Sequence, residues 1–139
     1  MDESANDKPA IPTHGNATLV GATLAFEHGS FIDLNAEIAR LEADPSKEEA
    51  GHKTKMLARY PEFRIVLITM RAGSRWNDHK TSSRILVQLL RGQIRFHTPS
   101  GVFDMSPGHV LALDPGVVHS VDSVAESAFL LTLSAASQK

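Results

Sequence analysis

From His52 onward, short apolar runs rich in β-branched residues are separated by glycine, proline and serine, and this pattern restricts the fold more than any other feature. The turn signals recur at intervals of roughly eight to twelve residues, as they do in antiparallel sheets. The runs do not alternate with helical segments, which argues against α/β folds. The pattern predicts an all-β sandwich or barrel.

Two of these runs indicate how the strands should be covered. Residues 63–70 are almost continuously apolar, which predicts a strand covered on both faces. In residues 84–91 the side chains alternate between two faces. One face carries Ile85, Val87 and Leu89, and the other carries Leu86, Gln88 and Leu90. Gly92 then predicts a tight bend into the next strand.

The chain of 139 residues is long enough for one core but not for two. We expect residues 1–15 to form a flexible polar tail and residues 16–50 to form an extension with a strand and one short helix. Residues 51–139 should form the barrel. Within the extension, residues 17–26 favour a single strand because of their β-branched content.

The helix of the extension has clear start and stop signals. Asp33 can cap its N-terminus, and Asp44 with the following proline ends it. Glu37 and Glu42 should lie to the sides of an apolar stripe. The stripe consists of Leu34, Ile38 and Leu41. Such a narrow stripe fits a helix that lies against the sheet, and a dimer contact is the alternative.

Charge and composition exclude several functions. The formal charge of −2 leaves no basic surface for nucleic acid. The absence of cysteine excludes disulfides, thiolate catalysis and cysteine-ligated metal clusters. No apolar stretch is long enough to span a membrane, and the polar, acidic start does not resemble a signal peptide. We therefore expect a cytoplasmic protein with no nucleic-acid partner and no membrane partner.

Two glycine-and-histidine segments with fixed spacing carry the functional signal. In the first, Gly73 is followed after five residues by His79, and Gly92 ends the segment. In the second, Gly108 precedes a proline-glycine turn that leads to His119. Imidazole serves both as a metal ligand and as a general base, so the two histidines are the candidate site residues.

The first segment resembles the first signature motif of the cupin family, small β-barrels that often hold a metal ion. That motif is G-x5-H-x-H-x3–4-E-x6-G, and Gly73, His79 and Gly92 match it. Thr81 and Ile85 stand where the motif has its second histidine and its glutamate. The chain is thus similar to a cupin with an incomplete set of metal ligands.

The second segment resembles the second cupin motif, G-x5-P-x-G-x2-H-x3-N. Gly108, Gly116 and His119 match it, while Asp114 and Ser123 replace its proline and asparagine. The resemblance covers roughly residues 51–134 and is strongest to small single-domain, RmlC-like cupins of unassigned function. It implies an all-β jelly-roll barrel, also called a double-stranded β-helix.

The resemblance implies His79 and His119 as the possible metal ligands. Non-haem iron takes two histidines and a carboxylate, and zinc usually takes at least three protein ligands. A third ligand would have to come from elsewhere, and the candidates are His52, His97 and Asp114. No cofactor is firmly expected, and a divalent metal ion (iron, zinc, nickel or manganese) stays open.

A ligand pocket is expected inside the barrel. Alternation along a strand puts Asn77, His79 and Thr81 on one face, which in a cupin points inward. Trp76 should lie at the rim, where it covers the barrel or stacks on a ligand. The pocket would be small, mostly apolar and lightly polar. Its predicted residues are Trp76, Asn77, His79, Thr81, Ile85, Val87 and His119.

Three functions of different classes follow. The preferred one is a cupin that binds a small organic ligand in its barrel with weak or no metal. The first alternative is a metal-dependent enzyme, dioxygenase- or isomerase-like, that acts on a small acid or sugar through His79 and His119. The second alternative is a structural dimer module without a ligand. The sequence assigns no catalytic residue.

The outward row Leu86, Gln88 and Leu90 is too apolar to face water alone. Many cupins bury such a face against a second copy, and an isologous homodimer is therefore expected. The expected partners are therefore a small-molecule ligand and a second copy of the chain.

Overall fold

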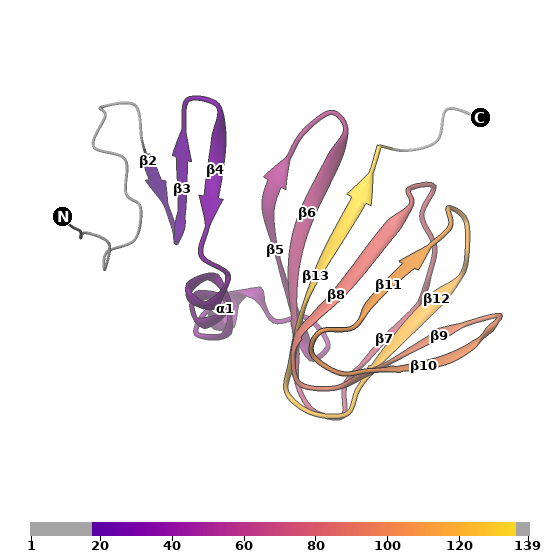
Figure 1. Cartoon of the computed structure of the whole chain (residues 1–139). Helices are drawn as coiled ribbons and strands as arrows, with labels where there is room; N and C mark the ends of the chain where they lie inside the picture. The colour runs from indigo at the N-terminus through magenta and orange to yellow at the C-terminus, as the bar shows by residue number, and fades with distance from the viewer. Residues whose placement is uncertain (1–17, 136–139) are drawn as a thin grey trace. The chain divides into compact units, whose positions relative to one another are not determined.

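The computed structural model describes residues 18–135, which divide between Arg40 and Leu41 into two compact units (Figure 1). The predicted tail, residues 1–15, lies outside the described residues. Within residues 18–135, no helix combines the length and the apolar character needed to cross a membrane.

The N-terminal unit begins with a three-stranded antiparallel sheet. Its strands are β2 (Thr18–Val20), β3 (Thr23–Phe26) and β4 (Gly29–Ile32). The single strand predicted over residues 17–26 is wrong, because the chain turns at Gly21 with a φ of 63°. Glycine adopts this left-handed conformation without steric strain, and the turn pairs β2 with β3.

Helix α1 spans Leu34–Glu42, as the sequence predicted. The backbone N–H of Ala36 donates to the Asp33 carboxylate at 3.1 Å, which confirms the cap. Glu37 was predicted at the side of the helix but is fully buried. Its carboxylate accepts hydrogen bonds from the Thr23 hydroxyl at 2.6 Å and from the Ala22 N–H at 3.2 Å. A buried carboxylate needs such donors, and these attach the helix to β3.

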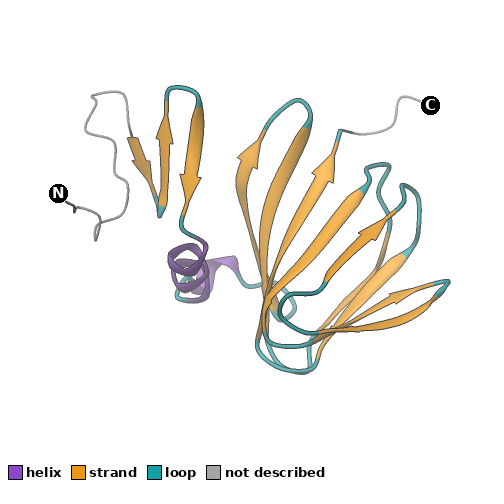
Figure 2. Ribbon diagram, in the orientation of Figure 1, coloured by secondary structure: helices purple, strands orange, loops and turns teal. Residues whose placement is uncertain are grey.

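The second unit continues through a short 3-10 helix, η1 (Pro45–Lys47), into two antiparallel sheets that form the barrel (Figure 2). One sheet has the strand order β10-β9-β12-β7, and the other has the order β11-β8-β13-β6-β5. The predicted all-β architecture is confirmed. The strands are β5 (His52–Arg59), β6 (Phe63–Met70), β7 (Arg75–His79), β8 (Ile85–Arg91), β9 (Ile94–Thr98), β10 (Gly101–Met105), β11 (Val110–Leu113), β12 (His119–Ser123) and β13 (Ser127–Ser134).

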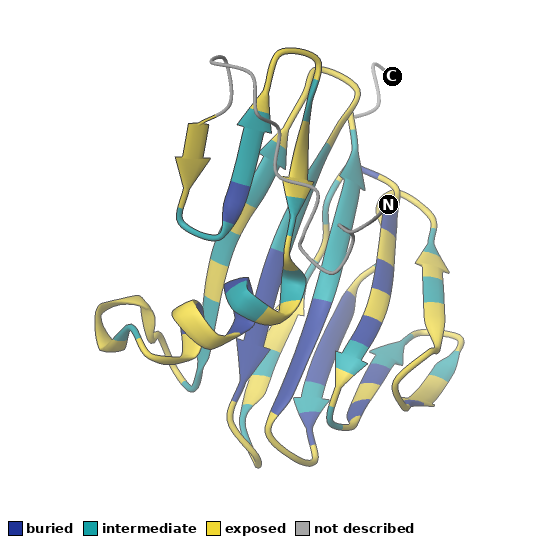
Figure 3. Ribbon diagram, turned by 60° about the vertical axis from the view of Figure 1, so that its left-hand side comes forward, coloured by how far each residue is buried: buried dark blue, intermediate teal, exposed yellow. Residues whose placement is uncertain are grey.

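The core of the barrel lies between the two sheets, and buried residues alternate with exposed ones along its strands (Figure 3). The alternation predicted for residues 84–91 is confirmed. The double coverage predicted for residues 63–70 holds only for the last four of them. The buried apolar cluster comprises Ile68, Met70, Ile85, Val87, Leu89, Ile94, Phe96, Met105, Val121 and Phe129.

Candidate functional site

A β-bulge in β7 determines which of its side chains enter the barrel. In the pairing of β7 with β12, Trp76 lies opposite Val121 and His79 lies opposite His119. Between these two pairs, the sequence number changes by three on β7 but by only two on β12. Strand β7 therefore contains one extra residue there. Paired residues share a face, and Trp76 and His79 therefore both point toward the core.

The bulge corrects the predicted alternation. Asn77 is exposed, and its side chain does not share a face with His79. Strand β7 ends at His79, so Thr81 lies in the following loop, where its hydroxyl accepts a hydrogen bond from the Ser83 N–H at 3.1 Å. Ile85 and Val87 were also predicted to line the pocket. Both are buried in the apolar cluster, with exposed fractions of 2% and 0%.

The two imidazoles lie together, with ring centroids 4.3 Å apart in an edge-to-face arrangement. Nδ1 of His79 is 2.7 Å from the carbonyl oxygen of Asn77, and Nδ1 of His119 is 3.0 Å from that of Val117. A carbonyl only accepts, so each Nδ1 carries the proton in the neutral ring. The Nε2 atoms are left as hydrogen-bond acceptors.

The two histidines belong to a series of five rings. His52 stacks on Trp76 with centroids 4.7 Å apart, and Trp76 lies 4.9 Å from His79. At the other end, His119 stacks on Phe96 at 5.3 Å. Nδ1 of His52 is buried and has no hydrogen-bond partner among the described residues. The series connects the edge strand β5 to the interior of the four-stranded sheet.

Burial lowers the pKa of His119 below its usual value of 6.5, because the charged ring would lose its hydration. The hydrogen bond to Val117 raises this pKa in part, the neighbouring His79 lowers it further, and Asp78 raises it. The net direction is downward, so His119 is neutral at pH 7.

We expect acid to destabilise the folded protein through His119. Its folded pKa lies below its unfolded pKa of 6.5, so the unfolded chain binds the proton more tightly. The free energy of unfolding should be highest above pH 6.5 and should decrease as the pH falls toward the folded pKa of His119. The total decrease is about 1.4 kcal/mol for each pH unit between the unfolded and the folded pKa. Urea unfolding between about pH 7.5 and about pH 5 measures this loss. His119→Gln should have a flatter profile, and equal profiles would contradict the assignment.

The donor set does not fit a stable metal site. His79 and His119 offer two nitrogen ligands, but Thr81 bonds to the local backbone and Ile85 is an apolar core residue. Iron and zinc sites in proteins use at least one further ligand. Among residues 18–135, no group of three or more histidine, aspartate or glutamate side chains is placed to hold a metal ion.

Within residues 18–135, none of the three candidate third ligands forms a metal-binding group with the histidine pair. His97 makes a 2.7 Å contact with the Asp122 carboxylate. Asp114 forms an ion pair with Arg84 at 2.6 Å. The ring of His52 is separated from the histidine pair by an indole. None of them completes the ligand set.

A cavity of about 590 Å³ lies between β10 and β11, and we call it the slot. These strands are joined by a turn but diverge into different sheets (Figure 1). None of the seven predicted pocket residues lines the slot. The lining residues are Thr98, Ser100, Phe103, Asp104, Met105, His109, Val110, Leu111, Ala112, Leu113, Asp114 and Val117.

The slot is close to the series of rings, because one of its lining residues is the cross-strand neighbour of a ring in the series. Phe103 lines it and is paired across the strands with Phe96, which stacks on His119. Val117 also lines the slot, and its carbonyl oxygen accepts the proton of His119. The turn signals of the sequence separate short strands, but they do not locate a pocket between β10 and β11.

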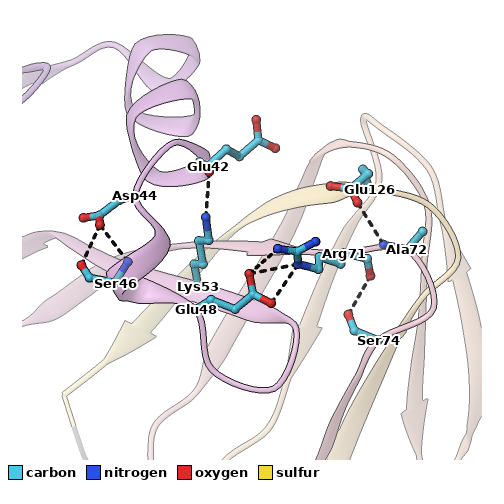
Figure 4. A network of polar contacts seen from close by, with 9 residues as sticks. All are labelled: Glu42, Asp44, Ser46, Glu48, Lys53, Arg71, Ala72, Ser74 and Glu126. Atoms are coloured by element: carbon cyan, nitrogen blue, oxygen red, sulfur yellow. Dashed lines mark hydrogen bonds and ion pairs between the residues drawn. The ribbon is translucent and has the colours of Figure 1, made fainter.

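A second cavity, of about 530 Å³, is lined mainly by charged residues, and Figure 4 shows the polar contacts of several of them. Most of these charges pair with one another. Arg71 binds both carboxylate oxygens of Glu48 at 2.7–2.9 Å, which lowers the pKa of Glu48. Arg91 pairs with Glu42, whose backbone carbonyl accepts from Lys53 at 2.7 Å. The arrangement serves as an ion-pair network and leaves little charge for a ligand.

No family model and no curated protein matches the sequence. Solved structures do match. An RmlC-like cupin from Shewanella frigidimarina aligns with a TM-score of 0.60 and 19% identity over 65% of this chain and 81% of that one. KdgF from Halomonas sp. gives a TM-score of 0.60 and 16% identity over 64% and 84% of the two chains. At such identities the likeness concerns the fold alone.

A larger protein also matches. Oxalate decarboxylase from Bacillus subtilis aligns with a TM-score of 0.60 and 16% identity. The alignment covers 67% of this chain but only 28% of the decarboxylase. The strand arrangement described above therefore occurs both in small single domains and as part of a longer chain.

Proposed function

Because its barrel has the cupin jelly-roll fold, we propose that this chain binds a small organic ligand without a metal ion, in the slot between β10 and β11. The slot is the observation that carries the proposal. Its volume of about 590 Å³ lies within the usual range of small-molecule sites. A fold shared by proteins of many functions does not by itself indicate a ligand.

The walls of the slot suit a mostly apolar ligand. Apolar side chains from both strands and from the following loop supply most of its surface, and burying a ligand against them provides the driving force. These side chains are Phe103, Met105, Leu111, Leu113 and Val117. His109 and Asp114 add polar groups that can orient the ligand.

The slot proposal is tested by screening a small-molecule library with ligand-observed NMR and repeating the hits on two variants. Phe103→Ala should weaken binding by about tenfold, because it removes an aromatic wall. Val102→Ala is the matched control, since Val102 is 55% exposed on the same strand but does not line the slot. Compounds that bind the Phe103→Ala variant normally but do not bind His79→Ala would indicate that the ligand site lies at the imidazoles.

The alternative of a metal-dependent enzyme predicts a different metal content. With two imidazole ligands only, we expect chelator-free protein to contain far less than one metal ion per chain after incubation with iron, zinc, nickel or manganese. Elemental analysis measures this content, with His79→Ala and His119→Ala as references. A content near one metal ion per chain that is lost in both variants would contradict the metal-free binding proposal and favour the metal-dependent enzyme.

The homodimer stays a prediction. Leu86 is 41% exposed on the outer face of the five-stranded sheet, and Leu90 is half-buried. Leu86 also belongs to an uncharged row that crosses the sheet from Ala112 to Ala58. A sedimentation measurement at micromolar concentration should give twice the chain mass, and a monomer would remove the prediction.

A further inference from the structure

The barrel presents four sheet edges within the described part of the chain: β10 and β7 in one sheet, β11 and β5 in the other. A free edge exposes unpaired backbone N–H and C=O groups and invites pairing with another strand. Natural proteins protect such edges with charged residues, prolines or bulges. The four edges of this barrel differ in that protection.

Strands β5 and β7 are protected. Each contains an irregularity in its register, which twists an edge away from a flat partner. Each also carries charged side chains. These are Lys53, Lys55 and Arg59 on β5, and Arg75 and Asp78 on β7.

Strands β10 and β11 lack this protection. The sequence of β11 is Val-Leu-Ala-Leu, without a charge or a proline, and its register with β8 is regular. In β10 the register with β9 is also regular, and Asp104 is the one charged residue. Large apolar side chains are exposed on both strands, Val110 at 54% and Phe103 at 44%. Both unprotected edges border the slot.

The backbone of β11 itself forms a wall of the slot. Every residue from 109 to 114 lines the slot, whereas a wall of side chains would include every second one. The Leu89 N–H donates to the carbonyl oxygen of His109, so the backbone of His109 faces β8. In an antiparallel ladder the next positions alternate, and Val110 and Ala112 therefore direct their N–H and C=O groups toward the slot.

We infer that the ligand of the slot is a short extended peptide, which pairs with the free edge of β11 as an added strand. The inference rests on the proposed function, because it assigns a chemical class to the ligand of the same slot. Residues 109–114 extend over about 17 Å, the length of a five- or six-residue strand. A peptide satisfies the edge groups of Val110 and Ala112 along that length, whereas an aliphatic or aromatic ligand leaves them to water.

The charges of the slot specify the ends of the peptide. Asp104 and Asp114 line the slot on β10 and after β11, and none of the lining residues is lysine or arginine. The ion pairs of the two aspartates with Arg95 and Arg84 are exposed and therefore weak. A peptide with basic residues at both ends and apolar β-formers between them complements this surface. Its inward side chains contact the apolar wall around Phe103.

The test is a binding screen on the full chain. The probe is an array of capped hexapeptides with lysine or arginine at both ends and valine, isoleucine, threonine, leucine or phenylalanine between them. Members should bind, and replacing the terminal basic residues of the best binder with glutamate should weaken its binding by about tenfold. The best binder is then synthesised with a single N-methyl group at each inner position in turn.

N-methylation distinguishes strand pairing from simple apolar contact. Methyl groups at alternate positions should each weaken binding by about tenfold, because they remove hydrogen bonds to β11. Methyl groups at the intervening positions should change the affinity by less than about threefold. A uniform effect, or none at any position, would overturn the paired-strand inference.

A protein variant tests the same contact from the other side. Ala112→Pro removes an N–H that faces the slot, and proline is tolerated on an edge strand when its N–H is not used in the ladder. It should weaken binding of the best hexapeptide by about tenfold, while Ala112→Ser keeps the N–H and should bind normally. The N-methyl series provides the same information if Ala112→Pro does not fold.

The outcomes separate this inference from the function on which it rests. If no hexapeptide binds while library compounds bind in a Phe103-dependent way, the slot is a ligand site and the peptide inference is wrong. If neither peptides nor compounds bind, both proposals fail.

Discussion

Phe96→Ala should lower the free energy of unfolding by about 3–5 kcal/mol, the usual loss when a buried aromatic side chain is truncated. Phe96 is 1% exposed, and it lies between the buried apolar cluster and the ring of His119. The side chains around such a buried ring relax only partly into the space that it leaves. Urea unfolding followed by circular dichroism at pH 7.5 measures the change.

The matched control is Phe103→Ala. Phe103 lies directly opposite Phe96 on the neighbouring strand and has the same side chain, but it is 44% exposed to the slot. Its loss should lower the unfolding free energy by only about 1 kcal/mol, because much of the ring already faces solvent. Equal losses at the two positions would mean that the slot is closed in solution.

Gly92→Ala should be nearly as damaging, with a loss of about 2–5 kcal/mol. Gly92 has a φ of +91°, a left-handed conformation that costs other residues about 1–2 kcal/mol. A Cβ atom would also lie 2.3 Å from the backbone oxygen of Glu126 and 2.7 Å from Cα of Ser127. Relieving such backbone contacts typically adds about 1–3 kcal/mol. The same urea unfolding measurement applies.

Gly73→Ala separates the two contributions. Gly73 also has a left-handed backbone, with φ at +80°, but no atom lies within 4 Å of the position of an added Cβ. Its substitution should cost only the conformational term of about 1–2 kcal/mol. If the two alanine variants were equally stable, the chain at Glu126 would be free to move away from Gly92.

The glycines illustrate what sequence reasoning can and cannot reach. Gly73 and Gly92 hold equivalent places at the ends of one motif, and the motif predicts a bend at Gly92. The difference in crowding depends on Glu126 and Ser127, which approach Gly92 only after the sheet has formed. Local turn signals and side-chain alternation specify the strands, and for that reason the all-β fold and the buried face of β8 were predictable.

The candidate site was less accessible from the sequence for the same reason. Asn77 was assigned to the interior by simple alternation, but the bulge that turns it outward exists only in the pairing of β7 with β12, about forty residues later. The slot was missed because β10 and β11 follow each other closely, as in a hairpin. Their separation depends on hydrogen bonds to β9 and β8 instead of to each other.

The series of rings provides a spectroscopic probe within the native chain. Trp76 is the single tryptophan of the protein, and its indole lies between the imidazoles of His52 and His79, with centroids 4.7 and 4.9 Å away. A positive charge on either imidazole interacts with the indole π-system and changes its emission. Intrinsic fluorescence therefore reports on the binding of a cation or a ligand at these histidines without any label. Loss of the signal change in His52→Gln or His79→Gln identifies which ring produces it.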